Sequence, residues 1–254
     1  MNVGKTTILT EFFSKFKDLG LAPRYVFSDK DFAQINAAKN VWPNAHVQLC
    51  LWHIKRSILT KMKSGKKQEK YRAFTNIEME HLDFVDRNFC PSNDNVDIIC
   101  PAQHQNDVLA LVERHFNLHP LIPIGPEGLF LTSEEIWKKA VWEIYQFCHA
   151  NGYAKLWNYL FFSWYTQNRW NLWARSSNPT IPFGKTNMLV ESHWKVLKHD
   201  YLYRFNRPRL DYVVFILCES LFQHNGTLLS IGKWEDKSIL VGGFQTHVEK
   251  VRCC

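Results

Sequence analysis

The chain opens with a helical pattern of apolar side chains and then a strand-like one. Residues 6–19 carry apolar side chains at helical spacing, and Gly20 then supplies a C-terminal stop, so the pattern predicts a helix. The β-branched and aromatic run 24–28 predicts a short buried strand. That strand delivers Asp29 to its C-terminal end, where acids frequently belong to functional sites.

A second helix and a second strand follow. Asp31 and Gln34 form a capping pattern, which predicts a helix that starts at Asp31 and ends before Pro43. Residues 46–51 alternate strictly between two faces, which predicts a half-buried strand, and a basic helix comes next. Short strands that alternate with helices favour neighbouring parallel strands in an α/β core, although two strands alone make a poor sheet.

The rest of the chain has mainly helical periodicity. One predicted helix starts at the capping box Thr132–Glu135, and another amphipathic helix is predicted after Asn187. A buried helical stripe is predicted from Leu210 to Leu221, and the periodicity is weak beyond residue 224. Large aromatic residues at helical spacing usually bury each other, so core packing is the role predicted for Trp157, Trp164, Trp170 and Trp173.

Composition narrows the class of protein. The chain of 254 residues is 46% hydrophobic, which excludes a disordered tail and allows one large domain or two small ones. The formal net charge of +7 favours a polyanionic partner. Seven widely spaced Cys residues without a secretory signal suggest free thiols, and the apolar run 213–218 is too short for a membrane span. We therefore expect a protein that is soluble, not secreted and without a membrane partner.

Two blocks of the sequence resemble the MULE (Mutator-like element) transposase domain. The first block consists of residues 28–33 (SDKDFA), 41–43 (VWP) and 48–56 (QLCLWHIKR). The second block resembles the segment around the family's last acid, and it consists of residues 170, 173–175 (WAR), 186–195 (TNMLVESHWK) and 207–211 (RPRLD).

The resemblance implies an α/β fold that is predominantly helical, with a partial ribonuclease-H-like core interrupted by a large all-α insertion. Residues 1–63 would form the partial core, 64–185 a mostly helical insertion, and 186–224 the C-terminal core helices with the last acid. Residues 225–254 would be a tail, because Cys253 and Cys254 resemble the opening of a SWIM-type zinc finger. We expect a fragment that lacks the N-terminal strands and most of that finger.

The resemblance also assigns catalysis to Asp29 and Glu191. In the family three carboxylates hold two divalent metal ions, Mg²⁺ or Mn²⁺, for phosphodiester transfer. Asp29 matches the second acid and Glu191 the third, so their carboxylates are expected about 4–6 Å apart around a shared ion. The first acid would lie on a strand upstream of residue 6, and its loss implies impaired activity. The residues alone leave other roles open: Asp29 would be a surface acid or a partner of Lys30, and Glu191 would form a salt bridge to Lys195.

Zn²⁺ is a second candidate cofactor. Cys50 and His53 have the spacing of half a zinc site and resemble a Cys-x-x-His motif of Mutator-like enzymes. Cys90, Cys100 and His104 would complete a site if the fold brings them together. The alternative is that these thiols are small buried hydrophobes.

Basic side chains form two clusters that would contact DNA phosphates. The first follows the second predicted strand and includes Lys55 and Arg56. The second is interleaved with aromatic residues, such as Trp194, that would stack on bases. Its basic residues are Lys195, Lys198, Arg204, Arg207 and Arg209. A solvated basic face is the alternative interpretation. The expected partner is double-stranded DNA, at transposon ends and target sites, and a homo-oligomer is a further option. The DNA substrate implies a nuclear location, and the cytoplasm is the other expected location.

The sequence thus predicts a MULE-type transposase-derived protein for metal-dependent DNA strand cleavage and transfer. Two alternatives stay open: a non-catalytic DNA-binding or interaction module derived from a transposon, and an inactive gene fragment.

Overall fold

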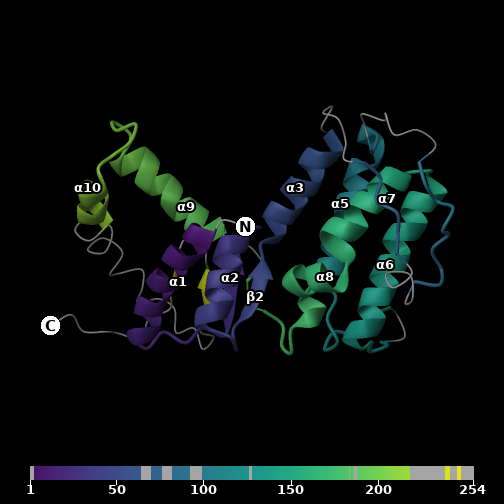
Figure 1. The fold of residues 1–254 in the computed structure, drawn as a ribbon, viewed down its shortest axis with the longest axis horizontal. Helices are drawn as coiled ribbons and strands as arrows, with labels where there is room; N and C mark the ends of the chain where they lie inside the picture. The colour runs from purple at the N-terminus through teal and green to yellow at the C-terminus, as the bar shows by residue number, and fades with distance from the viewer. Residues whose placement is uncertain are drawn as a thin grey trace. The chain divides into compact units, whose positions relative to one another are not determined.

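The computed structural model describes residues 3–63, 70–75, 82–91, 99–125, 128–182, 184–185, 188–217, 238–240 and 245–246. The chain divides into two compact units, residues 1–47 together with 186–254, and residues 48–185. Most of the described elements are helices (Figure 1), which confirms the prediction of a predominantly helical chain that also contains strands.

Helix α1 and strand β1 open the first unit. α1 (Val3–Asp18) buries Phe13 from the apolar face that its spacing predicted. Gly20 follows the helix with φ of 88°, a conformation that residues with a Cβ atom rarely adopt. β1 (Tyr25–Ser28) buries all four of its residues, which is typical of a strand covered on both faces. The predicted helix and strand are confirmed.

α2 (Phe32–Val41) packs beside α1 (Figure 1). Phe13 of α1 stacks on Trp42, with ring centroids 5.5 Å apart. The indole N–H of Trp42 donates to the main-chain oxygen of Leu21 at 2.9 Å. These contacts fix α2, and with it the residues that follow β1.

Four short strands form one sheet in the order β2-β1-β3-β4. β2 (His46–Leu49) neighbours β1 on one side, and β3 (Ser238–Leu240) pairs with β1 in parallel on the other. β4 (Gln245–Thr246) pairs antiparallel with β3. The sequence pattern did not predict β3 and β4, so the sheet is larger than the two strands that were expected.

β2 is buried on both faces, so the prediction of a half-buried strand is wrong. Gln48, on the polar face, is only 1% exposed. Its amide nitrogen donates to the main-chain oxygen of Trp173, and its amide oxygen accepts from the side chain of Asn178 at 2.8 Å. The alternation of polar and apolar residues predicted an exposed polar face. That face is buried because a polar side chain that is hydrogen-bonded can be buried at little cost.

The C-terminal segment of the first unit is helical. α9 (Met188–Val196) continues into the π-helical turn η3 (Leu197–Tyr201), and α10 (Leu210–Phe215) follows after a loop. Leu197, Leu202 and Ile216 form a buried cluster, against which Trp194 packs. The amphipathic helix predicted after Asn187 is confirmed.

α10 confirms the predicted helix but not its predicted buried stripe. Leu210 is 77% exposed and Val214 48% exposed, while Leu221 lies outside the described residues. Val213 and Leu217, which belong to the predicted stripe, are partly buried and pack against the cluster around Ile216. The buried face of α10 is therefore centred on a residue that the apolar spacing had left out of the stripe.

The second unit consists of helices around an aromatic core. Its described elements are α3 (Leu51–Lys63), α5 (Ala102–Asn117), α6 (Ser133–Ala150), α7 (Ala154–Leu160), the π-helical turn η1 (Phe161–Tyr165), α8 (Gln167–Trp173) and the 3-10 turn η2 (Arg175–Ser177). The capping box Thr132–Glu135 forms as predicted. The predicted core tryptophans 157, 164, 170 and 173 are each at most 2% exposed, which confirms core packing. Across the described part of the chain, no helix has the length and apolar character to cross a membrane.

Candidate metal centre and nucleic-acid interface

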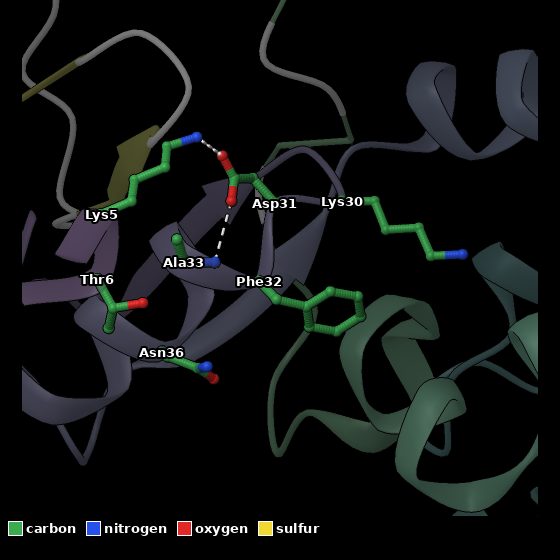
Figure 2. Close-up of a pocket in the computed structure, with 7 residues that line it drawn as sticks. All are labelled: Lys5, Thr6, Lys30, Asp31, Phe32, Ala33 and Asn36. Atoms are coloured by element: carbon green, nitrogen blue, oxygen red, sulfur yellow. Dashed lines mark hydrogen bonds and ion pairs between the residues drawn. The ribbon is translucent and has the colours of Figure 1, made fainter. Parts of the chain in front are cut away.

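Two acids follow β1, and Asp31 has a structural role. Its carboxylate accepts a hydrogen bond from the backbone N–H of Ala33 at 2.9 Å and pairs with the ammonium group of Lys5 (Figure 2). Burial opposes ionisation of Asp31, but the bonds from Lys5 and Ala33 outweigh it and hold the pKa of this carboxyl below its ordinary value. The prediction that Asp31 caps the second helix is confirmed.

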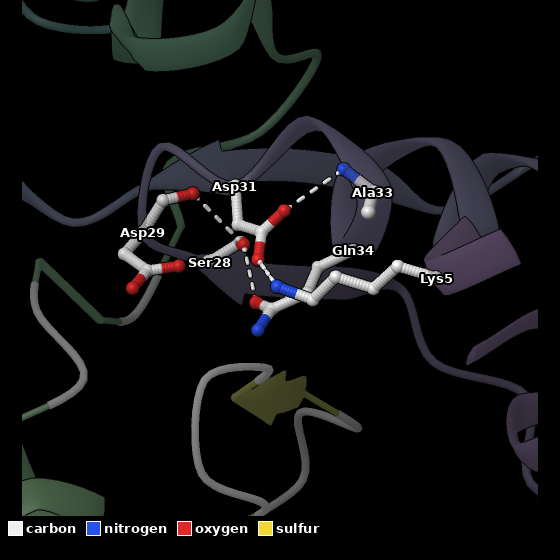
Figure 3. Close-up of polar contacts among 6 residues, drawn as sticks. All are labelled: Lys5, Ser28, Asp29, Asp31, Ala33 and Gln34. Carbon is white, nitrogen blue, oxygen red and sulfur yellow. Dashed lines mark hydrogen bonds and ion pairs between the residues drawn. The ribbon is translucent and has the colours of Figure 1, made fainter. Parts of the chain in front are cut away.

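Asp29 lies one residue beyond β1, and its carboxylate has no part in the bonds around Asp31 (Figure 3). The Oδ1 atom of Asp29 is shielded from solvent and has no hydrogen-bond partner among the described residues. The alternative roles of Asp29, a surface acid or a partner of Lys30, stay predictions. A buried carboxylate oxygen without a partner is costly, and a cation would offset that cost.

Ser28 fixes the main chain at this strand end. Its hydroxyl donates to the main-chain oxygen of Asp29 at 2.9 Å and lies 3.2 Å from the amide oxygen of Gln34 (Figure 3). Gln34 was expected to complete the cap with Asp31, yet its side chain faces Ser28. The sequence analysis did not single out Ser28, although a hydroxyl residue directly before an acid at a strand end was the available signal.

α9 packs against β1 and carries Glu191. Val190 joins Tyr25 and Phe27 in one buried cluster, and Trp194 packs against that cluster one turn later. This contact holds the first turn of α9 against the strand that leads to Asp29. Glu191 is half-buried in that turn. The separation of about 4–6 Å between the two carboxylates stays a prediction.

The described residues offer no third carboxylate on the strands beside β1. β2 reads HVQL and β3 reads SIL, so neither contains an Asp or Glu residue. Within the described ranges, no three His, Cys, Asp or Glu side chains gather so that they would hold a metal ion. The assignment of Asp29 and Glu191 to one metal site therefore stays a prediction.

A cavity of about 520 Å³ opens beside the strand end without including Asp29. Residues at the starts of α1 and α2 line it (Figure 2), among them Lys5, Asp31 and Phe32. Its carboxylate belongs to Asp31, which Lys5 and Ala33 already bond. The carboxylate that lines this cavity is therefore already bonded, and the role of Asp29 as a metal ligand stays a prediction.

The candidate zinc ligands do not form a metal-binding cluster among the described residues. Cys50 is fully buried directly before α3, and His53 is half-buried in the first turn of that helix. Nδ1 of His104 lies 2.7 Å from the hydroxyl of Tyr153. Burial raises the pKa of the Cys100 thiol to about 11, which disfavours the thiolate that zinc requires. A zinc site formed by these residues stays a prediction.

Lys55 and Arg56, the basic pair predicted to contact DNA, are engaged within the second unit. The ammonium group of Lys55 lies 2.5 Å from the carboxylate of Glu113. The guanidinium of Arg56 lies 5.0 Å from the ring centroid of Trp52. A contact of these residues with DNA stays a prediction, and Glu113 partly neutralises the charge of Lys55.

The basic residues of the segment from α9 to α10, here called the α9–α10 segment (Met188–Phe215), are more accessible than Lys55 and Arg56. Lys195, Lys198 and Arg207 are exposed and form no ion pair with the described residues. Arg204 donates from Nε to the hydroxyl of Tyr203 at 2.7 Å. Arg209 pairs with Asp211 at 2.8 Å, so its charge is partly neutralised.

Comparison with known proteins adds one finding. Residues 4–57 match the family described as the MULE transposase domain, a span that contains α1 except Val3, then β1, α2, β2 and the first half of α3. No curated protein and no solved structure gives a significant match. Asp29, Cys50 and His53 lie inside the matched span, and Glu191 lies outside it. The match confirms the resemblance over residues 4–57, a segment that is similar to the MULE transposase domain.

Proposed function

We propose that the chain is a transposase-derived DNA-processing protein in which Asp29 and Glu191 bind a divalent metal ion, Mg²⁺ or Mn²⁺. The observation that carries the proposal is the shielded Oδ1 atom of Asp29, which has no donor among the described residues. Hard cations prefer carboxylate oxygens, so this atom fits such an ion. The packing of Val190 on β1 supports the pairing with Glu191, its neighbour in α9. A ribonuclease-H-like core is part of the proposal.

The reaction proposed is cleavage and transfer of a DNA phosphodiester. When bound, the ion lowers the pKa of a water molecule and polarises the phosphate. The chain's own residues would position the ion, since β1 and α9 hold the two carboxylates and Ser28 fixes the main chain at Asp29. Loss of either carboxylate would weaken the hold on the ion, so cleavage is expected to fall by orders of magnitude when one of the two is replaced.

Nicking of supercoiled plasmid DNA with Mn²⁺ tests the proposal. Slow, metal-dependent nicking is expected from the chain and should be lost in Asp29→Asn and in Glu191→Gln. The matched control is Asp18→Asn, which changes an exposed acid at the end of α1 and should leave nicking unchanged. Nicking that survives both substitutions, or that persists in EDTA, would rule out this pair of ligands.

A non-catalytic DNA-binding module is the second candidate function. Lys195, Lys198 and Arg207 favour it, because they are exposed and form no ion pair within the described ranges, and such side chains bind phosphates without any metal. Salt-dependent binding of duplex DNA with no nicking in any variant would select this function. An inactive gene fragment would instead show neither DNA binding nor a cooperative melting transition.

A further inference from the structure

A second cavity, of about 560 Å³, lies entirely within the α9–α10 segment. It is lined by Trp194, Tyr203 and Phe205, with Leu197, Leu202 and Pro208. None of these residues takes part in the proposed metal centre. The cavity belongs to one continuous stretch of about twenty residues, so its shape depends on the local fold of that stretch.

The cavity has a firm floor and an exposed aromatic rim. Trp194 packs on the buried cluster that contains Leu197 and Leu202, which fixes the floor. Tyr203 is 62% exposed and Phe205 is 48% exposed, and both rings border the opening. Aromatic rings that stay in water beside an apolar cavity mark a binding surface for a flat, apolar group.

The charges around the cavity identify the kind of ligand. The stretch 194–213 contains two carboxylates, Asp200 and Asp211, and five basic side chains, namely Lys195, Lys198, Arg204, Arg207 and Arg209. Asp211 is paired with Arg209, and Lys198 borders the cavity without an ion pair among the described residues. The guanidinium of Arg204 lies 5.2 Å from the ring centroid of Tyr203. The opening thus combines stacking surfaces with positive charge.

We propose that this cavity binds an unpaired base of single-stranded DNA, with the neighbouring phosphates on Lys198 and Arg207. Every base has a flat face that stacks on aromatic rings, and the adjacent phosphates are anionic. A base-paired duplex keeps those faces inside its stack, so the cavity selects single strands or flipped bases. The choice of DNA as the strand rests on the proposed function, and the inference deepens that function by naming a site for melted DNA.

The test compares two single strands with the same phosphates, oligothymidylate and an abasic oligomer of about twenty nucleotides, by fluorescence anisotropy in EDTA. Oligouridylate RNA of the same length is measured alongside them. Oligothymidylate is expected to bind at least about fivefold more tightly. The double variant Tyr203→Leu with Phe205→Leu should abolish that preference. Lys198→Gln should weaken the binding of both oligomers to the same extent. The matched control is Phe215→Leu, which changes a 58% exposed ring of α10 outside the cavity and should keep the preference.

Three results would overturn the inference: equal affinity for both strands, a preference that persists in the double variant, or tighter binding of oligouridylate RNA. Melting curves of each variant exclude unfolding as the cause of a lost preference, and both mutated rim rings are exposed enough for such changes to be tolerated. EDTA removes the metal, so the outcome is independent of nicking. Failure of the metal proposal and failure of the base site are therefore distinguishable.

Discussion

Asp31 stabilises the start of α2 through bonds that depend on its negative charge. Asp31→Ala should lower the free energy of unfolding by about 1 kcal/mol at neutral pH, as is usual for loss of an N-cap. The folded pKa of Asp31 is below the unfolded one, so its contribution is present above about pH 4 and is lost as the pH falls through the folded pKa. Urea denaturation at several pH values measures this, and the deficit of the variant should shrink in acid. Asp18→Ala is the control, and an equal deficit there would contradict the capping role.

His115 gives the second unit a different pH dependence. Its Nδ1 atom lies 2.8 Å from the hydroxyl of Tyr165 and its Nε2 atom 2.9 Å from the carboxylate of Glu143. Burial, together with the nearby charge of Arg114, lowers the pKa of His115 below its ordinary value although Glu143 raises it. The unfolded chain therefore binds a proton more readily, and stability should fall as the pH drops from about 7.5 to 5.5.

The variant His115→Gln isolates this residue. It removes the titrating group, so the variant should show a smaller loss of melting temperature over the same pH range. His119, whose pKa burial also lowers, should leave a residual slope. Melting followed by circular dichroism gives the comparison, and identical slopes in both proteins would exclude His115 as a source of the pH dependence.

At the scale of elements, Gln48 ties β2 to the helical turns near Trp173 and Asn178. Gln48→Leu would leave the buried amide of Asn178 without its acceptor, which should cost about 1–3 kcal/mol. Denaturant titration measures the loss. Gln103→Leu, an exposed change on α5, should shift stability by no more than about 0.5 kcal/mol. Equal effects of both substitutions would show that the buried network contributes nothing.

Elements with local signals could be predicted from the sequence, and those defined by distant partners could not. The capping box at Thr132 and the helix stop at Gly20 each depend on a few neighbouring residues, and the structure contains both. The burial of Gln48 depends on residues more than a hundred positions away. β3 has three residues and is defined by its pairing with β1, so no periodicity marks it.

The candidate site follows the same rule. A buried apolar run before an acid marked Asp29, whereas Glu191 came only from the resemblance, because its helix has no local sign of a partner strand. The missing donor at Oδ1 of Asp29 is a property of packing and could not be predicted. The aromatic residues of the α9–α10 segment were noted, but the cavity that they border depends on how η3 and the following loop turn.

At the scale of the whole chain, the pairing of β3 with β1 joins the C-terminal region to the first strand. Deletion of residues 225–254 should turn β1 into an edge strand and remove hydrogen-exchange protection from those amides of Tyr25–Phe27 that point toward β3. Amides of α6 in the second unit serve as the internal control and should keep their protection. Unchanged exchange in β1 after the deletion would contradict the pairing.

The central claim is that Asp29 and Glu191 share one divalent metal ion, and Mn²⁺ binding followed by electron paramagnetic resonance tests it most directly. The chain should bind one equivalent of Mn²⁺ without any DNA. Asp29→Asn and Glu191→Gln should each weaken binding by at least about tenfold, and Asp18→Asn should leave it unchanged. Equal Mn²⁺ affinity in all four proteins, or no binding by the unmodified chain, would contradict the account.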